Sequence, residues 1–395
     1  MLFTVILVFA SLLGLAMMAF FLYVAYGQPF GRIADAINET YLHQSPHWRE
    51  GYFQNVIETK TGSSAWETIK STYKFMTQGQ DRRPKPKLAV RPVHPTQLQR
   101  LARSRTVVTW LGHSALLLQI DGQLWLLDPM LGKRVSPVDW FGPSRFCDQP
   151  PLTADQIPAV DVVVISHDHW DHLDHRTIKA IHGRVGRFVT ALGVKSHLVH
   201  WGVAAEKITE LDWHQSLQLG GVTLTATPSR HFSGRKRRQL YKTFWASFVI
   251  RSARHRLFFG SDSGYFEGFS KIGERYGPFD LTMLECGAYS DYWPDIHMAP
   301  EETAQAHLDL RGRLLLPIHW GAFSLALHPW REPIERLLTI AEQQRIEVIH
   351  PMVGGCYELG GKLPKERWWE KDYCALPTEA VDNPGIPVPP PGVTV

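Results

Sequence analysis

The densest group of metal-binding side chains in this chain directly follows an apolar run, Val160–Ile165. Four potential ligands fall within six positions: His167, His169, Asp171 and His172. Asp168 is a fifth candidate. A loop that leaves a buried strand can turn successive side chains inward, and zinc prefers imidazole and carboxylate where thiolates are absent. A lone histidine is typical of a structural residue, but this clustering predicts a metal centre suited to hydrolysis.

Three more candidate ligands each follow a separate apolar run with the composition of a β-strand. They are His231, Asp262 and His319. We therefore expect each of them at the carboxyl end of a strand. Taken singly, each is typical of a structural residue. Taken with the histidine cluster, the three complete the ligand set of a two-metal site.

Alternating strand and helix patterns must position these side chains. Apolar runs and tight turns predict strands at 107–111, 115–120, 124–127, 160–165, 223–227, 247–250 and 256–259. Helices are predicted at 177–182, 192–201, 300–310 and 332–345. Because strands and then helices occur twice over, the order favours an α/β sandwich with sheets inside and helices outside.

The first residues form an almost unbroken apolar run, Leu2–Tyr26, without a charged side chain. About 20 such residues span a bilayer as a helix, so a membrane anchor is the favoured interpretation. The alternatives are a cleaved signal peptide, which normally begins with basic residues, and a buried helix, which is rarely apolar all round. The first basic residues, Arg32 and Arg49, follow the run and favour a cytoplasmic catalytic part.

These patterns divide the chain into four expected parts. They are an anchor at 1–27, a linker and accessory region at 28–105, a hydrolase domain at 106–375 and a Pro-rich disordered tail at 376–395. Within the accessory region, residues 55–73 could hold a helix, and 80–87 have the composition of a solvated linker.

Composition limits the partners and the kind of metal site. The net charge of +4 permits contact with an anionic surface without requiring it, and no nucleic-acid partner is expected. The 4 cysteines form no Cys-x-x-Cys pair, so neither a disulfide framework nor a cysteine zinc site is predicted. The sequence does not indicate an oligomeric state.

Short motifs around the candidate ligands resemble a known family. They lie at 109–113, 128–129, 136–137, 142–146, 171–174, 227–232, 261–265, 277–280, 287–289, 297–302 and 318–321. The histidine cluster resembles that of the metallo-β-lactamase superfamily. Gly-Pro-Ser-Arg-Phe at 142–146 and Ile-His-Trp-Gly at 318–321 resemble its N-acyl-phosphatidylethanolamine-hydrolysing phospholipase D family. The resemblance covers residues 107–351.

The resemblance implies an αββα sandwich with two zinc ions at one edge. It implies seven protein ligands: His167, His169 and His231 on one zinc, Asp171, His172 and His319 on the other, and Asp262 on both. Asp171 and Asp262 would also orient the nucleophile. His297 matches a histidine near the substrate in the family. It is the candidate to give the leaving alkoxide a proton or a charge partner, and the alternative is an ordinary surface histidine.

One motif departs from the family pattern. The family usually has Gly-Asp-Thr-Gly around the bridging carboxylate, whereas this chain has Ser-Asp-Ser-Gly at 261–264. Because the carboxylate of Asp262 is retained, we expect an intact metal site.

Two further groups of side chains lie close to the candidate ligands in sequence. The basic run Arg235, Lys236, Arg237 and Arg238 either forms a solvated face or contacts anionic lipid. The aromatic residues Tyr289, Tyr292 and Trp293 either line an acyl groove or pack in the core.

Two classes of activity fit these residues. The first is phospholipase D-type cleavage of a membrane phospholipid such as N-acyl-phosphatidylethanolamine, which gives an N-acylethanolamine and phosphatidic acid. The second is hydrolysis of a soluble lactone or phosphodiester. A non-enzymatic scaffold is the third interpretation, and the complete ligand set argues against it. No motif in the chain selects the lipid, and fold analogy should not decide it.

Overall fold

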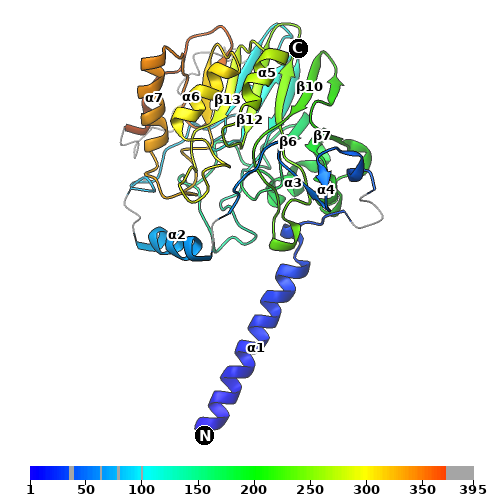
Figure 1. The fold of residues 1–395 in the computed structure, drawn as a ribbon, viewed down its shortest axis with the longest axis vertical. Helices are drawn as coiled ribbons and strands as arrows, with labels where there is room; N and C mark the ends of the chain where they lie inside the picture. Colours follow the sequence, from blue (N-terminus) through cyan, green and yellow to red (C-terminus); the bar gives the residue numbers. More distant parts are fainter. Residues whose placement is uncertain (35–39, 63–64, 78–80, 99–100, 371–395) are drawn as a thin grey trace.

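Two β-sheets stacked face to face form the centre of the protein, as a computed structural model of the chain shows (Figure 1). The structure describes residues 1–34, 40–62, 65–77, 81–98 and 101–370. The tail predicted at 376–395 lies outside these residues and stays a prediction.

The strand that directly precedes the histidine cluster, β6 (Val160–Ile165), belongs to the first sheet. Its strand order is β15 (Cys356–Glu358), β3 (Thr106–Trp110), β4 (Leu116–Ile120), β5 (Gln123–Leu127), β6 (Val160–Ile165), β7 (Val185–Ala191) and β8 (Ile208–Leu211). The second sheet has the order β14 (Leu315–Ile318), β13 (Leu281–Glu285), β12 (Arg256–Ser261), β11 (Ser247–Arg251), β10 (Val222–Thr227) and β9 (Ser216–Leu219). A separate small sheet pairs β1 (Trp48–Arg49) with β2 (Tyr52–Phe53).

Both faces of the first sheet are buried, and the two-residue period of its strands divides their side chains between two cores. On β4, Leu116 and Leu118 belong to the core between the sheets, whereas Leu117 points to the other face. On β5, Trp125 and Leu126 divide in the same way. The sequences of these strands are therefore continuously apolar and do not alternate between apolar and polar residues.

Helices cover the outer faces of both sheets. On the first sheet, α3 (His175–Ile181) and α4 (Lys195–His200) bury Ile178, Ile181 and Leu198 against the strands. On the second sheet lie α5 (Gly268–Tyr276), α6 (Pro300–Asp309) and α7 (Glu332–Gln344) (Figure 1). This arrangement confirms the predicted αββα sandwich.

Most predicted elements are present with small shifts at their ends. The helix predicted at 192–201 is shorter, because β7 continues to Ala191 and a turn at Gly193, with a φ of +84°, separates it from α4. The sequence analysis did not predict the strands β1, β2, β7, β8, β9, β13 and β15 or the helix α5.

The apolar N-terminal run forms one helix, α1 (Leu2–Tyr26), which extends away from the domain (Figure 1). It is long and apolar enough to cross a membrane, and none of its residues is buried by the protein. The alternative of a buried helix is therefore wrong. Its last turn is tied to the domain, because the Tyr23 hydroxyl donates to the Pro137 carbonyl at 2.9 Å and Lys236 Nζ donates to the Ala25 carbonyl at 3.1 Å.

The accessory region packs on the sandwich. Phe53 stacks on Phe244 with ring centroids 4.5 Å apart. The helix α2 (Ala65–Thr77) begins later than the predicted helix at 55–73, because the segment before it runs over the site: Asn55 Nδ2 donates to the His231 carbonyl at 2.7 Å. The division of the chain at residues 27 and 105 stays a prediction.

Candidate metal centre

The carboxyl ends of six strands from both sheets meet at one edge of the sandwich. Strand β5 is parallel to β6, and β12, β13 and β14 are parallel to one another, with β10 in the same direction through two antiparallel pairings. Polar residues follow these ends: Asp128 after β5, the histidine cluster after β6, His231 after β10, Asp262 after β12, Glu285 in β13 and His319 after β14. Loops at this edge can therefore bring residues that are far apart in sequence to one place.

Three imidazoles converge on one side of this edge. His167 Nε2 lies 2.9 Å from His169 Nδ1, and His231 Nε2 lies 3.1 Å from the same atom. One ligand atom from each of the three lies within 4.8 Å of those of the other two. The group has the composition expected for one metal ion.

A second group lies beside the first and shares Asp262 with it. His319 Nε2 is 3.3 Å from Asp171 Oδ2, and His172 Nε2 is 3.6 Å from that oxygen. Asp262 Oδ2 is 3.1 Å from both His172 Nε2 and His319 Nε2. The same oxygen is 3.7 Å from His231 Nε2 and 3.9 Å from His167 Nε2. Asp262 therefore stands between the two groups.

The outer nitrogen of several imidazoles is fixed by a hydrogen bond, which turns the other nitrogen toward the cluster. His167 Nδ1 lies 2.9 Å from Ser166 Oγ, His231 Nδ1 lies 2.9 Å from the Ile296 carbonyl, and His172 Nδ1 lies 2.8 Å from Asp128 Oδ2. Such outer partners set ring orientation at metal sites.

Unpartnered buried atoms test whether this cluster fits a metal. Within the described residues, His172 Nε2, His319 Nε2 and Asp262 Oδ1 are buried without a hydrogen-bond partner. A buried polar atom without a partner is costly, and all three atoms lie where the ligand groups meet. These residues therefore fit divalent metal ions held by nitrogen and oxygen atoms.

The charge state of two of the imidazoles agrees with this fit. Burial lowers the pKa of His167 and His231 well below their ordinary values, so both imidazoles are neutral, which is the form that ligates. Burial acts to raise the pKa of Asp262, yet the imidazoles of His172 and His319 hold it well below its usual range. Burial acts to lower the pKa of His172 and His319, yet the Asp262 carboxylate raises both, so these two imidazoles carry the positive charge that the buried carboxylate needs and that metal ions can supply in their place.

Asp128 and two serines form a layer behind the cluster that the sequence analysis did not assign to the site. The Asp128 carboxylate accepts hydrogen bonds from the Ser166 backbone N–H at 2.8 Å and the Ser166 hydroxyl at 2.6 Å. It also accepts from the Ser261 hydroxyl at 2.8 Å. The departure from the family motif at Ser261 thus adds a hydroxyl to this layer. The signal that could have found Asp128 is its position directly after a strand.

Glu285 was also missed, because it lies inside an otherwise apolar strand. It is fully buried, and its carboxylate accepts from the Ser263 backbone N–H at 2.7 Å and lies 2.7 Å from His297 Nδ1. His297, Asp171 and Asp262 line the same cavity. The structure thus brings His297 to the rim of the cluster, and its catalytic role stays a prediction.

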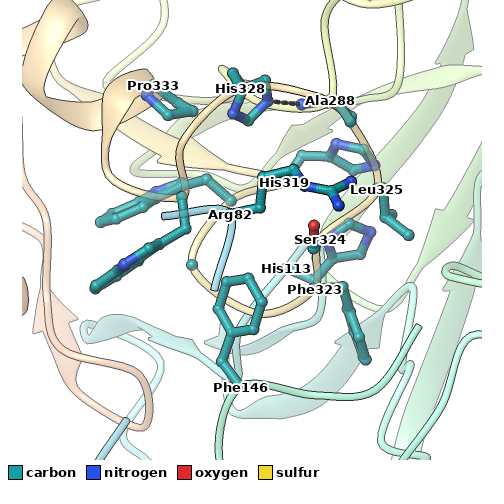
Figure 2. A pocket seen from close by; sticks show the side chains of 14 residues that line it. Arg82, His113, Phe146, Ala288, His319, Phe323, Ser324, Leu325, His328 and Pro333 are labelled. Carbon is teal, nitrogen blue, oxygen red and sulfur yellow. Dashed lines mark hydrogen bonds between the residues drawn. The ribbon is translucent and has the colours of Figure 1, made fainter. Parts of the chain in front are cut away.

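The structure also adds His113 and Arg82 to the surroundings of the cluster. His113 Nε2 lies 2.9 Å from Asp171 Oδ2. Figure 2 shows both residues in a pocket beside His319, and this pocket shares Ala288 and Leu325 with the cavity at the cluster. Arg82 Nη2 donates to the Phe75 carbonyl and the guanidinium lies over the Phe75 ring, but among the described residues its Nε and Nη1 have no hydrogen-bond partner, and no carboxylate lines the pocket.

The basic run beside His231 is only partly exposed. Arg235 is buried: its Nη1 donates to the Asp168 and Leu173 carbonyls, both at 2.8 Å, and burial lowers its pKa to about 10. Lys236 binds the end of α1. The expectation of four accessible basic residues is therefore wrong for Arg235, while Arg237 and Arg238 are exposed.

The three aromatic residues have different surroundings. Trp293 lines the cavity at the cluster. Tyr289 donates its hydroxyl to Glu332 at 2.6 Å and packs on the ring of His328. Tyr292 lies under the ammonium group of Lys74. Of the three, Trp293 faces the cavity.

Comparison with known proteins agrees with this geometry. The family described as "Beta-lactamase superfamily domain" matches residues 125–320, which include all seven candidate ligands. The chain belongs to the metallo-β-lactamase superfamily. Its fold and its cluster of metal-binding side chains make it a metal-dependent hydrolase of this superfamily.

Relatives within the superfamily are similar over most of their length. An uncharacterized protein of Mycobacterium tuberculosis is 42% identical over 350 residues, which are 87% of this chain and 93% of the relative. N-acyl-phosphatidylethanolamine-hydrolyzing phospholipase D 1 of Caenorhabditis elegans is 32% identical over 250 residues, 60% of this chain and 70% of the relative. The resemblance to that family is thereby confirmed.

A solved structure of the superfamily shares the fold. The metallo hydrolase Igni18 of Ignicoccus hospitalis aligns with a TM-score of 0.51 at 20% identity, over 65% of this chain and 100% of that chain. At this identity the likeness supports the architecture and says nothing of the substrate.

Proposed function

We propose that this hydrolase holds two zinc ions and cleaves N-acyl-phosphatidylethanolamine-like membrane phospholipids to N-acylethanolamine and phosphatidic acid. The observation that carries the metal assignment is the position of Asp262, whose Oδ2 lies within 3.1 to 3.9 Å of four imidazoles. A carboxylate shared by two nitrogen-rich groups is suited to two metals about 3.5–4 Å apart.

Different residues have different roles in the proposed hydrolysis. Bound zinc ions supply Lewis acidity and lower the pKa of water to about 7. Asp171 and Asp262 line the cavity, where their oxygens can orient a water molecule toward phosphorus. Hydrolysis forms a bond from this water to phosphorus and breaks the bond from phosphorus to the leaving alkoxide, which then needs a proton.

His297 is the proposed proton donor to that alkoxide. Glu285 holds one side of the His297 ring through Nδ1, so Nε2 is the nitrogen that can donate a proton to the substrate. General acid catalysis of this kind contributes about 10²–10⁴-fold. We expect His297→Gln to slow substrates with an alkyl leaving group by about that factor. A p-nitrophenyl diester, whose leaving group needs no proton, serves as the control, and equal losses on both substrates would contradict the assignment.

Arg82 supports an anionic substrate over a neutral lactone. Its guanidinium group lies in the pocket beside His319 without a carboxylate partner in the described part of the chain. A cation in a largely apolar pocket is unfavourable unless an anion joins it, and arginine binds phosphate oxygens through two parallel hydrogen bonds. A phosphodiester supplies that charge, whereas a lactone does not.

This preference is testable with a matched pair of variants. Arg82→Met should raise KM for a phosphodiester about tenfold or more, since a charged hydrogen bond contributes ~1.5–3 kcal/mol. Arg82→Lys keeps the charge and should retain part of the affinity. If Arg82→Met leaves the phosphodiester KM unchanged, the argument for an anionic substrate fails.

The location of the enzyme is part of the proposal. We place α1 across a membrane as an uncleaved anchor, with the catalytic domain on the cytoplasmic side, because the first basic residues follow the span. The relative of Caenorhabditis elegans acts, by its name, on a phospholipid. An anchored enzyme meets such a substrate in the plane of the bilayer.

The deciding experiment is hydrolysis of N-acyl-phosphatidylethanolamine in detergent micelles, with and without a chelator, followed by product identification. We expect release of N-acylethanolamine and phosphatidic acid that stops with the chelator and returns with zinc. Chelator-sensitive cleavage of a soluble lactone or phosphodiester, without turnover of the lipid, would assign the second class of activity instead.

A further inference from the structure

The helix α2 carries its apolar side chains on the side that faces away from the domain. Trp66, Ile69, Tyr73 and Met76 recur at the spacing of one helix face. All four are exposed, with 72% of Trp66 and 80% of Met76 accessible. A surface helix normally buries such a face, so within the part of the chain that the structure describes this face lacks its expected partner.

The polar face of the same helix is the one that contacts the protein. Glu67 lies 3.6 Å from Lys60, and the Lys74 ammonium lies 5.7 Å from the centre of the Tyr292 ring. Ser71, on the same side, is half-buried. The domain therefore orients α2 with its apolar face outward.

A neighbouring loop extends this apolar face. Trp140 and Phe141 are exposed, Trp140 by 80%. They line one groove together with Phe75 and Met76 from the end of α2. We call Trp66, Ile69, Tyr73, Met76, Trp140 and Phe141 the docking surface. Contiguous exposed apolar residues of this kind mark interaction sites.

The docking surface lies at the end of the domain from which α1 leaves. Figure 1 shows α2 lying crosswise there, while α1 extends away from the domain. The loop is also tied directly to α1, since the Tyr23 hydroxyl donates to the carbonyl of Pro137, just before Trp140. If α1 spans the membrane, α2 lies roughly parallel to the membrane surface. This arrangement is expected of an anchored protein whose domain rests on the bilayer.

Charge and residue type agree with a lipid partner. Arg82, Arg83, Lys85 and Arg134 line the groove between α2 and the loop, where Asp81 is the acidic lining residue. Basic residues beside a membrane attract anionic headgroups. Tryptophan and tyrosine, as at 66, 73 and 140, are enriched where a membrane meets water.

We propose that the docking surface inserts into the headgroup region of the bilayer that holds α1. This inference rests on the proposed anchoring by α1 and is independent of the substrate. It has a consequence for the active site: α2 touches Tyr292, and the adjacent Trp293 lines the cavity at the metal cluster. Docking therefore places the mouth of the site at the lipid surface.

The test uses the full chain in nanodiscs of phosphatidylcholine and phosphatidylglycerol. Bimane is attached at Ile69→Cys or at Phe141→Cys, in a background with Cys356 and Cys374 changed to serine; Cys147 and Cys286 are buried. Leu308→Cys on α6, an exposed leucine far from α1, is the matched control (Figure 1). Brominated lipid reports contact with the bilayer, and iodide reports contact with water.

We expect brominated lipid to quench bimane at 69 and 141 at least about threefold more than at 308, with iodide showing the reverse. Quenching of all three positions by iodide alone would overturn the proposal. Protection of 69 and 141 from both quenchers would overturn it in favour of a protein partner or a second copy of the chain. Elution of the protein with the nanodiscs reports the anchoring by α1 separately, so the two failures are distinguishable.

Discussion

The metal cluster and the docking surface both reverse the usual distribution of side chains, but in opposite senses. The cluster buries ionisable groups, such as Asp262 and Glu285, and hydrogen bonds from Ser263 and His297 hold the Glu285 carboxylate in place. The docking surface exposes Trp66 and Met76, and among the described residues the protein contacts the polar face of α2. The first site is completed by small ions within a rigid frame, whereas the second is completed by a partner outside the chain.

This difference predicts how the two regions respond to change. Atoms in the cluster depend on one another, so a single substitution there should have a large effect under all conditions. Side chains of the docking surface contribute separately, so single changes should have small effects that appear only when a bilayer is present.

The largest effect should come from Asp262→Asn. The change removes the charge from an oxygen that approaches both ligand groups, so metal content should fall below two per chain and kcat by about 10³-fold. Metal analysis together with turnover measures both. Glu267→Gln, at an exposed residue, is a control that should change neither. Full metal content with full activity would show that Asp262 is not needed for metal binding or for turnover.

Asp128→Asn should have the next largest effect. All four groups around its carboxylate donate or can donate hydrogen bonds, from Ser166 twice, from Ser261 and from His172. An amide NH₂ would face at least one donor, so we expect metal affinity to fall by about 10–100-fold. Titration with a competing chelator measures this loss. An unchanged affinity would show that the outer layer does not orient His172.

Changing Ile69 and Tyr73 to serine together tests the docking surface. Because both side chains are exposed, the free energy of unfolding in detergent should change by no more than about 0.5 kcal/mol per substitution. Turnover of a substrate embedded in vesicles should fall about tenfold, since burial of one such side chain contributes ~1.5–3 kcal/mol. Turnover of a short-chain soluble substrate should stay the same. Equal losses on both substrates would show that α2 supports the active site itself and does not act through the membrane.

The smallest effect should come from Ser261→Gly, which restores the usual residue of the family motif. The change removes the hydroxyl that donates to Asp128, but it also relieves a backbone φ of +50° that glycine adopts readily. The two effects oppose each other, so we expect the free energy of unfolding to move by less than about 1 kcal/mol. Thermal unfolding measures it, and a loss of several kcal/mol would show that the hydroxyl is essential to the layer.

The sequence by itself determined the chemistry of the cluster and the class of the fold. The seven predicted ligands, His167, His169, Asp171, His172, His231, Asp262 and His319, all meet in the structure, and their role as ligands stays a prediction. They could be found because ligand chemistry depends on residue type, and because each follows an apolar run that ends at one edge of a sheet. The same runs, with the helices between them, predicted an α/β sandwich with sheets inside and helices outside, and the family resemblance specified it as αββα.

Only the tertiary structure decided which side chains support the cluster and which face of α2 is free. Asp128 and Glu285 reach the cluster from separate strands, and Arg82 comes from a region with no recognisable motif. Arg235 looked accessible in a basic run, yet it is buried against two carbonyls. These outcomes depend on contacts between residues far apart in sequence. A local pattern can show that a helix has an apolar face, but packing decides whether that face meets the core or the surroundings.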